Sequence, residues 1–384
     1  MGWYCFYTIL RVVMKKRNQV FNFLEALAII MVIDDHMSTR IGILSSIFPY
    51  NSFYMPLFVF ISGYFYREKK IGENIKHKVC HLLPTYLAWA VVGEVIAYIL
   101  MKLGIVNWYA DPFHLKSLIR LFTIDSLTSI VGASWFVIML FWVSVSYNIL
   151  DNLFSLERKL HDYAFLLVSM LLGIIALKLC MAKYNHYLPY LFVLRTVWYI
   201  QFYHMGRLFH RYWECHVRNW NTLYTCMGCV GVNVLLICMV GDYINFYATA
   251  GMGSFHSSIL PIVTSFTGIL FWYKVMQYLS EKLGRVRIVD YIAENTFTIM
   301  ECHLMFVNLP NFYAYYQYLH GNVLYANFPV AKFIGDAWLR YSPNTRLIGF
   351  FCGLLGSLLT IFIIRWAGVQ IRNLNKRFQH RLLR

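Results

Sequence analysis

Two apolar runs of the chain carry ionisable side chains that could do acid–base chemistry. The first run, FNFLEALAIIMVIDDH, has Glu25 near its start and Asp34, Asp35 and His36 at its end. The second, ENTFTIMECH, ends at His303. A charged group inside a membrane-spanning helix costs about 2.5–3.5 kcal/mol on insertion scales. Membrane proteins that keep such groups usually use them, so both runs are candidate sites.

The spacing of the first run places Glu25 and His36 on one face of a single helix. Eleven residues make about three turns and cover roughly 16 Å. Asp34 and Asp35 flank that face, where either carboxylate could orient the His36 ring. The alternative is that His36 only marks the membrane boundary beside two solvated carboxylates.

The second run has a comparable arrangement. Thr296 lies seven residues before His303 and shares its helix face, whereas Glu301 lies about 200° further round and should face elsewhere. A lone membrane histidine is often only a hydrogen-bonding partner between helices. If both runs cross the membrane in the same direction, His36 and His303 lie at a similar depth, which favours a shared polar site.

Arg195 is an arginine inside a further apolar run. Left unpaired it would be costly, so we expect it to face a carboxylate, a water-filled cavity or an anionic ligand. Glu94 and Glu301 are the candidate carboxylates. The sequence is equally compatible with structural ion pairing and with ligand binding.

The nine cysteines form no convincing metal motif. Cys226 and Cys229 have CxxC spacing inside an apolar run without a second pair, and Cys302 adjoins His303. Structural zinc sites need four ligands. We predict no metal site and no bound cofactor.

The elements that must position these residues are membrane helices. Hydrophobic residues make up 59% of the 384 residues and charged residues only 14%, against about 25% charged in soluble domains. Ten apolar segments approach the roughly 20 residues that span a bilayer as a helix. Their approximate bounds are 19–38, 50–66, 80–101, 131–150, 162–182, 187–206, 222–243, 256–273, 289–308 and 347–364. We therefore predict an all-α, polytopic protein of about ten transmembrane helices, with the lipid bilayer as its surroundings.

The basic residues support this topology. With ten spans and the N-terminus inside, 24 of the 34 Lys and Arg residues lie in cytoplasmic stretches and 9 in external ones. This bias obeys the positive-inside rule and predicts that both termini are cytoplasmic. The net charge of +16 is then mainly a topology signal. A nucleic-acid partner is not expected, because such binding needs a soluble basic face.

The chain divides into three expected regions. Residues 1–18 form an N-terminal cytoplasmic segment, 19–370 the transmembrane domain and 371–384 a basic cytoplasmic tail. Met14 is an alternative start, because the basic cluster that follows it adjoins the first span. The external, aromatic stretch 309–346 is expected to lie at the interface or to cover a cavity. The sequence does not indicate an oligomeric state.

Four further segments follow the first run in a familiar order: MPLFVFISGYFYR, SWFVIMLF with Trp135, WYIQFYHMGRLF, and ENTFTIMECH. With them, the chain resembles the membrane acyltransferase-three family, the integral-membrane O-acyltransferases of bacterial surface glycans, over essentially its full length. The first span of that family carries a basic residue, ten further residues and a histidine. His36 stands at the histidine, but Glu25 replaces the basic residue. The paired arginines before the third span of the family fall on Lys78 and His81.

The resemblance implies transfer of an acyl group, commonly acetyl from acetyl-CoA as co-substrate, to a hydroxyl of a saccharide acceptor. A hydroxyl needs a base to become a good nucleophile, and a histidine with a pKa near 6.5 suits that task. We expect His36 to be this base, Asp35 or Asp34 to orient it, and His303 and Arg195 to stabilise the oxyanion or hold the acceptor. The remaining expected substrate-binding residues are Glu25, Lys78, His81, Trp135 and Thr296.

The resemblance also implies a multi-pass protein of the bacterial inner membrane. Two alternatives are a saccharide transporter or flippase, because intramembrane ionisable groups also build proton relays, and a non-catalytic relative. The acceptor glycan and the acyl chain are not identified by the sequence.

Overall fold

The computed structural model describes residues 18–37, 53–108, 113–124, 128–154, 159–240, 251–253, 257–339, 341 and 343–382. Within these ranges the chain forms helices and contains no strand, so the predicted all-α class is confirmed. Met14 and almost all of the N-terminal segment 1–18 lie outside the described residues.

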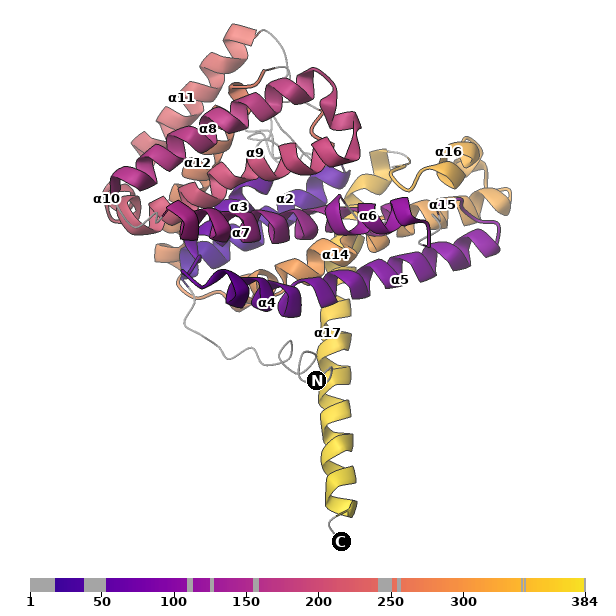
Figure 1. The fold of residues 1–384 in the computed structure, drawn as a ribbon. Helices are drawn as coiled ribbons and strands as arrows, with labels where there is room; N and C mark the ends of the chain where they lie inside the picture. The colour runs from indigo at the N-terminus through magenta and orange to yellow at the C-terminus, as the bar shows by residue number, and fades with distance from the viewer. Residues whose placement is uncertain are drawn as a thin grey trace.

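Ten longer helices build the bundle, and shorter helices and turns connect them (Figure 1). The longer helices are α2 (Gln19–Met37), α3 (Tyr54–Tyr64), α5 (Leu83–Lys102), α7 (Trp135–Phe154), α8 (Lys159–Met181), α9 (Leu188–Leu208), α11 (Thr222–Val240), α12 (Leu260–Leu283), α14 (Thr296–Val307) and α17 (Pro343–Leu382). The shorter ones are α4 (Ile71–His81), α6 (Leu115–Thr123), η3 (Ser129–Ser134), η4 (Tyr184–His186), η5 (Phe209–Trp213), α10 (Glu214–Asn219), α13 (Arg287–Glu294), α15 (Leu309–Leu319), η6 (Val323–Tyr325) and α16 (Val330–Gly335).

In the part of the chain that the structure describes, five helical stretches are long and apolar enough to cross a membrane: Ile71–Lys102, Ser129–Phe154, Lys159–Met181, Thr222–Val240 and Arg346–Ile371. Apart from Ser129–Phe154, their apolar cores are at most 28% buried inside the protein. Monomeric soluble proteins rarely expose continuous apolar faces of this size to water. The exposed faces therefore indicate lipid contact, and the chain is a membrane protein.

Several of the other helices lie inside the bundle. Helices α2, α3, α9, α12 and α14 supply most of the main buried cluster, together with α7. Neighbouring helices shield them from lipid, so they can carry polar and ionisable residues. Ten spans and the orientation of the termini remain predictions, as do the domain boundaries.

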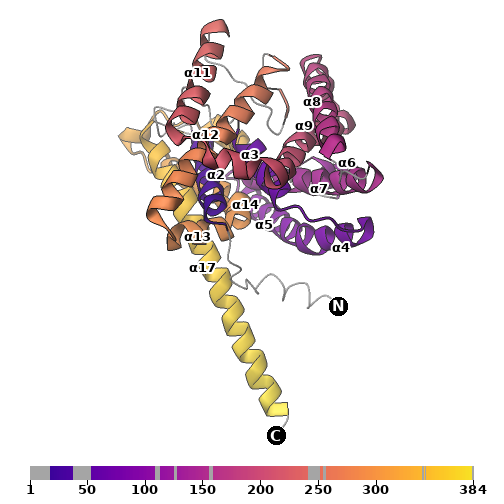
Figure 2. The same ribbon diagram turned by 90° about the vertical axis from the view of Figure 1, so that its left-hand side faces the viewer.

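Two details differ from the predicted segments. The span expected at 289–308 is broken at Asn295 into α13 and α14. The Asn295 side chain donates to the Tyr291 carbonyl at 2.6 Å and accepts from Arg365 at 3.1 Å, so it competes with regular helix bonding at the break. Helix α17 is longer than the span expected at 347–364, because it continues to Leu382 and extends away from the bundle (Figures 1 and 2).

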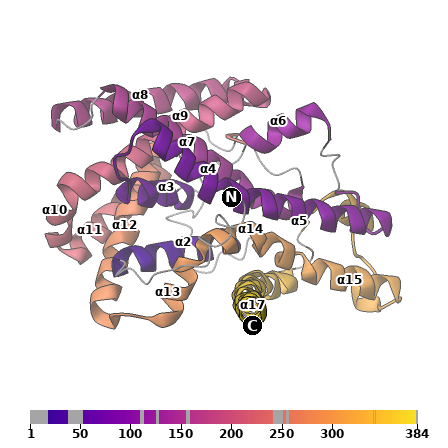
Figure 3. The same ribbon diagram turned by 60° about the horizontal axis from the view of Figure 1, so that its bottom comes forward.

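Helices α14 and α17 pack on each other, and Figure 3 shows α17 almost end-on beside α13 and α14. Small residues allow this contact. A Cβ added at Gly353 would lie 3.1 Å from Ile33 of α2, so α17 also approaches the helix that carries His36.

The closest helix contact joins α3 and α9 through two glycines. A Cβ at Gly63 would overlap the Tyr203 carbonyl oxygen, and one at Gly206 would overlap the Phe60 carbonyl oxygen. Glycine at both positions lets the two backbones touch, as small residues do between membrane helices.

We expect Gly63→Ala to lower the free energy of unfolding by about 1–3 kcal/mol or more, because backbone atoms cannot yield to the added methyl group. Thermal denaturation of the detergent-purified protein measures the effect. Gly231→Ala in α11 is the matched control, because a Cβ there meets no atom within 4 Å. Equal melting temperatures for both variants would contradict the close α3–α9 contact.

Candidate active site

The structure brings His36 and His303 together. The ring centroids of the two histidines lie 5.2 Å apart, and His36 lies equally far from the ring centroid of Trp338. His36 comes from the end of α2 and is partly exposed, whereas His303 in α14 is fully buried. The predicted shared site of the two histidines is therefore present, with a tryptophan as a third member.

The hydrogen bond of His303 determines which of its nitrogens is basic. Its Nδ1 lies 2.9 Å from the Ile299 carbonyl oxygen one turn earlier in α14. A carbonyl only accepts, so Nδ1 carries the proton and Nε2 is the unprotonated nitrogen of the neutral ring. His303 can therefore accept a proton or a hydroxyl hydrogen bond at Nε2, and it can donate there only as imidazolium.

The two aspartates beside His36 have different surroundings. Asp34 is 2% exposed, and Asp35 is partly exposed and accepts a hydrogen bond from the Tyr54 hydroxyl at 2.9 Å. This bond ties the end of α2 to the first turn of α3. Pro56 lies in that same first turn, where the backbone lacks an intrahelical partner anyway, so the proline does not interrupt α3. Orientation of His36 by Asp34 or Asp35 stays a prediction.

Trp338 reaches His36 because the segment after α14 folds back over the site. The Asn311 side chain in α15 donates to the Leu339 carbonyl at 2.5 Å, and Asp336 accepts from the Trp338 backbone N–H at 2.8 Å. The indole ring rests against Gly132 of η3, where an added Cβ would lie 3.0 Å away. Trp338 is nevertheless 43% exposed, so a substrate can reach this residue next to His36.

A cavity of about 230 Å³ lies at the other end of the same α2 face. Glu25 lines it together with Ser62 of α3, Thr296 at the start of α14 and the neighbouring Glu294. The remaining lining is mainly apolar side chains of α3, α7 and α14. Glu25 and His36 thus both face α14, as their spacing predicts, with Glu25 beside the cavity and His36 beside His303.

Lys78 and His81 lie on α4, next to this cavity along the chain. The residue after His81, Leu82, lines the cavity. Lys78 is partly exposed and His81 is exposed, with its ring 4.5 Å from the His77 ring. Two basic groups therefore stand near the cavity, although neither contributes to its wall.

Arg195 and Trp135 contact each other. The guanidinium lies 5.0 Å above the Trp135 ring, and Nη1 donates to the Ile124 carbonyl oxygen at 2.7 Å. Glu301, one of the carboxylates expected for Arg195, faces η3 instead and accepts from the Ser134 hydroxyl. Arg195 has 2% exposure and Trp135 has 8%. Substrate binding by this pair stays a prediction, and their described contacts hold α6, α7 and α9 together.

A second polar cluster, the Arg207 cluster, joins the ends of α7, α8 and α9 to the α3–α4 loop. The buried Arg207 side chain pairs with Asp151 and, at 2.6 Å, with Glu68. Its Nη1 also donates to the Tyr147 hydroxyl at 3.1 Å, which in turn lies 2.7 Å from His204 Nδ1. Each contact satisfies a buried polar group, as the apolar surroundings require.

The Arg207 cluster extends to α8 and η5. Arg211 pairs with Asp162 at 3.1 Å, and the same carboxylate accepts from the Tyr212 hydroxyl at 2.9 Å. Partial burial and this bond to a carboxylate raise the pKa of Tyr212 above its ordinary value. His204 Nε2 donates to the Asp162 carbonyl at 2.8 Å, so its Nδ1 accepts from Tyr147. These closed contacts indicate a structural anchor.

The described residues contain no group of three or more His, Cys, Asp or Glu side chains placed to hold a metal. Cys226 and Cys229 are free thiols. The side chains gathered around His36 and Glu25 carry imidazole, carboxylate, hydroxyl and indole groups.

Trp338, Tyr54 and the Arg207 cluster are absent from the sequence-based site. Trp338 had no positional signal, because nothing in the spacing shows that the segment around it folds back over His36. The Arg207 cluster had a weak one, since basic and acidic residues recur at the ends of four predicted spans on one side.

The comparisons with known proteins identify a family. The model of the family Acyl_transf_3, described as "Acyltransferase domain", matches residues 18–366. No curated protein and no solved structure matches the chain. The match covers α2, with His36, through α14, with His303, and most of α17. The chain therefore belongs to this acyltransferase family.

Proposed function

We propose that the protein transfers an acyl group, with acetyl as the expected one, from acyl-CoA to a hydroxyl of a cell-surface or exported saccharide. The observation that carries this proposal is the contact between the His36 and His303 rings. The exposed Trp338 also contacts His36. Acyl transfer to a hydroxyl needs a base that can reach solvent-delivered substrate and a surface that holds the acceptor. Both lie at one place here.

His36 is the proposed base. It is the more exposed of the two histidines, and Asp34 and Asp35 directly precede it in α2. His36 removes the hydroxyl proton while the oxygen attacks the thioester carbonyl carbon. The C–S bond then breaks, and the proton passes from the imidazolium to the departing CoA thiolate. His303, whose ring lies against that of His36, is the proposed group that holds the acceptor.

The donor is proposed to enter from the end of the bundle that carries α4. Lys78 there is the proposed charge for CoA phosphates, with His81 beside it as a hydrogen-bonding group. A CoA arm in the 230 Å³ cavity would meet Glu25 and Ser62 as hydrogen-bonding partners. The proposal includes a cytoplasmic α4 and a location in the bacterial inner membrane.

Trp338 is the proposed stacking surface for the sugar ring. We expect Trp338→Ala to raise the KM for the acceptor about 2- to 12-fold, the equivalent of 0.5–1.5 kcal/mol of ring interaction. Hydrolysis of acetyl-CoA without acceptor should change little, and Trp338→Phe should restore most of the affinity. Trp366→Ala, at an exposed position of α17, is the matched control. An unchanged acceptor KM in Trp338→Ala would remove the stacking role.

The direct test uses acetyl-CoA labelled in the acetyl group and a set of surface saccharides. The proposal predicts label on saccharide in an alkali-labile ester, formed only with the active protein. A transporter would instead move saccharide across proteoliposomes without consuming acetyl-CoA. Saccharide flux without ester formation would contradict the proposal.

A further inference from the structure

Two helix hairpins, α8–α9 and α11–α12, form the arms of an open arrangement around α3. The helices within each hairpin pack closely, and α9 and α12 both contact α3. Among the described residues, direct contacts between the two hairpins are sparse. Figure 2 shows the hairpins diverging, with α3 between them at the base.

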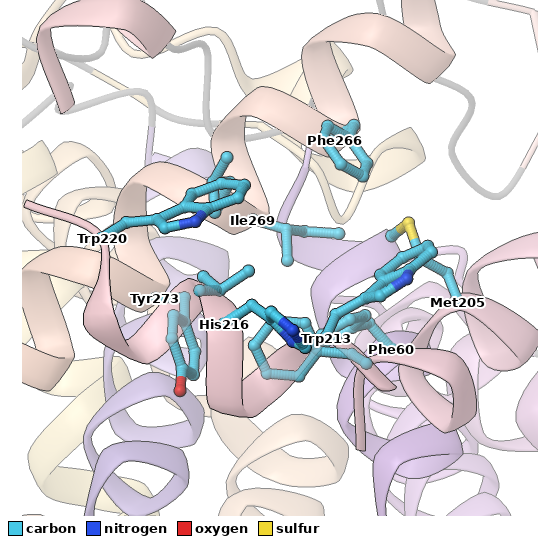
Figure 4. A pocket seen from close by; sticks show the side chains of 11 residues that line it. Phe60, Met205, Trp213, His216, Trp220, Phe266, Ile269 and Tyr273 are labelled. Carbon is cyan, nitrogen blue, oxygen red and sulfur yellow. The ribbon is translucent and has the colours of Figure 1, made fainter. Parts of the chain in front are cut away.

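Two adjoining cavities fill the space between the hairpins. One holds about 330 Å³ and lies between α9, η5 and α10 on one side and α12 on the other. The second holds about 290 Å³ and is lined by α8, α9 and α12. Met205, Trp213 and Phe266 line both, so the cavities are neighbours (Figure 4).

The walls of these cavities are almost entirely apolar. Gln201 is the exception in the second cavity, and its amide nitrogen donates to the Trp198 carbonyl at 2.9 Å. The Trp213 indole N–H is likewise engaged, with the Tyr163 hydroxyl at 2.9 Å. An apolar cavity without polar partners does not hold ordered water. In a bilayer, hydrocarbon is the medium that fills it.

A protein helix is a poor fit for these cavities. It is about 10–12 Å across with its side chains, and α8, α9 and α12 together bound the second cavity. A helix of a second copy would have to spread the two hairpins to enter. A single flexible hydrocarbon chain is narrow enough to enter.

The rim of the first cavity suits a phospholipid headgroup. His216 and Trp220 line it and are exposed, and Arg218 lies between them in sequence and is also exposed. Tryptophan favours the headgroup layer of a bilayer, and basic residues there attract anionic lipids. Figure 4 shows Trp220 and Phe266 on one side of the space and Trp213 and Met205 on the other.

We propose that this paired cavity binds an acyl chain of an anionic phospholipid, with the lipid phosphate beside His216 and Arg218. The site is separate from the histidine pair and does not depend on the proposed acyl transfer. Its occupant links the two hairpins, which otherwise meet mainly through α3. The bound lipid therefore stabilises the bundle.

Native mass spectrometry of the delipidated protein, titrated with phosphatidylglycerol, tests this site. We expect one tightly bound lipid and a higher melting temperature on binding. Leu270→Trp fills the first cavity. Each excluded methylene weakens binding about fourfold, so loss of two lowers affinity about 15-fold. Leu235 of α11 is 65% exposed, so Leu235→Trp is the matched control and should bind lipid normally. Ile269→Phe provides a milder filling variant if Leu270→Trp fails to fold.

The headgroup is tested separately with Arg218→Ala. We expect this variant to lose the preference for phosphatidylglycerol over phosphatidylcholine while it still binds a lipid chain. Phosphatidylglycerol affinity equal to wild type in a folded cavity-filling variant would overturn the proposal. Equal affinity of the wild-type protein for both lipids would overturn the assignment of an anionic headgroup. A protein dimer that forms in place of lipid binding would overturn the assignment of a lipid as the occupant.

Discussion

His36→Ala is expected to lower kcat for acyl transfer by about 10²–10⁴, the range of general-base catalysis. Among the described residues, the alanine removes the only imidazole whose ring contacts both His303 and Trp338. The variant should fold normally, because His36 is partly exposed at the end of α2. Steady-state rates with acetyl-CoA and acceptor measure the effect, and wild-type activity should fall as pH decreases through the pKa of the base.

Two further histidine variants give this result its meaning. His186→Ala, at an exposed position in η4, should keep the wild-type rate. His303→Ala should raise the acceptor KM more than it lowers the rate of acceptor-independent acetyl-CoA hydrolysis. A His303→Ala variant that loses hydrolysis while His36→Ala keeps it would reverse the two roles, because Nε2 of His303 is also an unprotonated ring nitrogen.

Arg207→Ala is expected to lower the free energy of unfolding by about 3–5 kcal/mol, the cost of leaving a buried ionic partner unpaired. The substitution leaves Asp151, 6% exposed, without its guanidinium and removes the donor to Tyr147. Arg207→Lys should rescue only part of the loss, because one ammonium group cannot reproduce the forked contacts with Asp151 and Glu68.

Chemical denaturation of the purified protein in detergent measures this loss. Arg287→Ala is the matched control, since Arg287 is exposed on α13. If Arg207→Ala and Arg287→Ala unfold at the same denaturant concentration, the Arg207 cluster is no anchor of the fold.

The helix class, the shared face of Glu25 and His36, and the pairing of His36 with His303 could be predicted from the sequence. Apolar length identifies a spanning helix, and the eleven-residue spacing fixes Glu25 and His36 on one face. The pairing follows from the similar depth of the two histidines in spans of the same direction. The number of spans is harder, since α2 and α9 carry charged residues and α14 has only 12 residues. Such helices are stabilised by their neighbours in the bundle, and a hydropathy criterion does not detect that shielding.

The rest of the site depends on contacts between distant segments. Trp338 stands 302 positions after His36 and reaches it only because Asn311 and Asp336 hold the returning segment. Glu301, one of the two candidate carboxylates for Arg195, shows that the direction of a side chain also depends on such contacts. Both are buried, but helix rotation directs Glu301 toward Ser134 and Arg195 toward Ile124. Residue type and depth were sufficient to select these groups, but their described partners depend on helix rotation.

The role of His36 as the base is tested most simply by release of CoA thiol from acetyl-CoA. The detergent-purified wild-type protein is compared with His36→Ala, and water can replace the unidentified acceptor, so the measurement needs only the donor. We expect thiol release by the wild-type protein and its loss in folded His36→Ala. Equal release by both proteins would contradict the role of His36, and folded wild-type protein that neither binds nor cleaves acetyl-CoA would contradict the proposed donor.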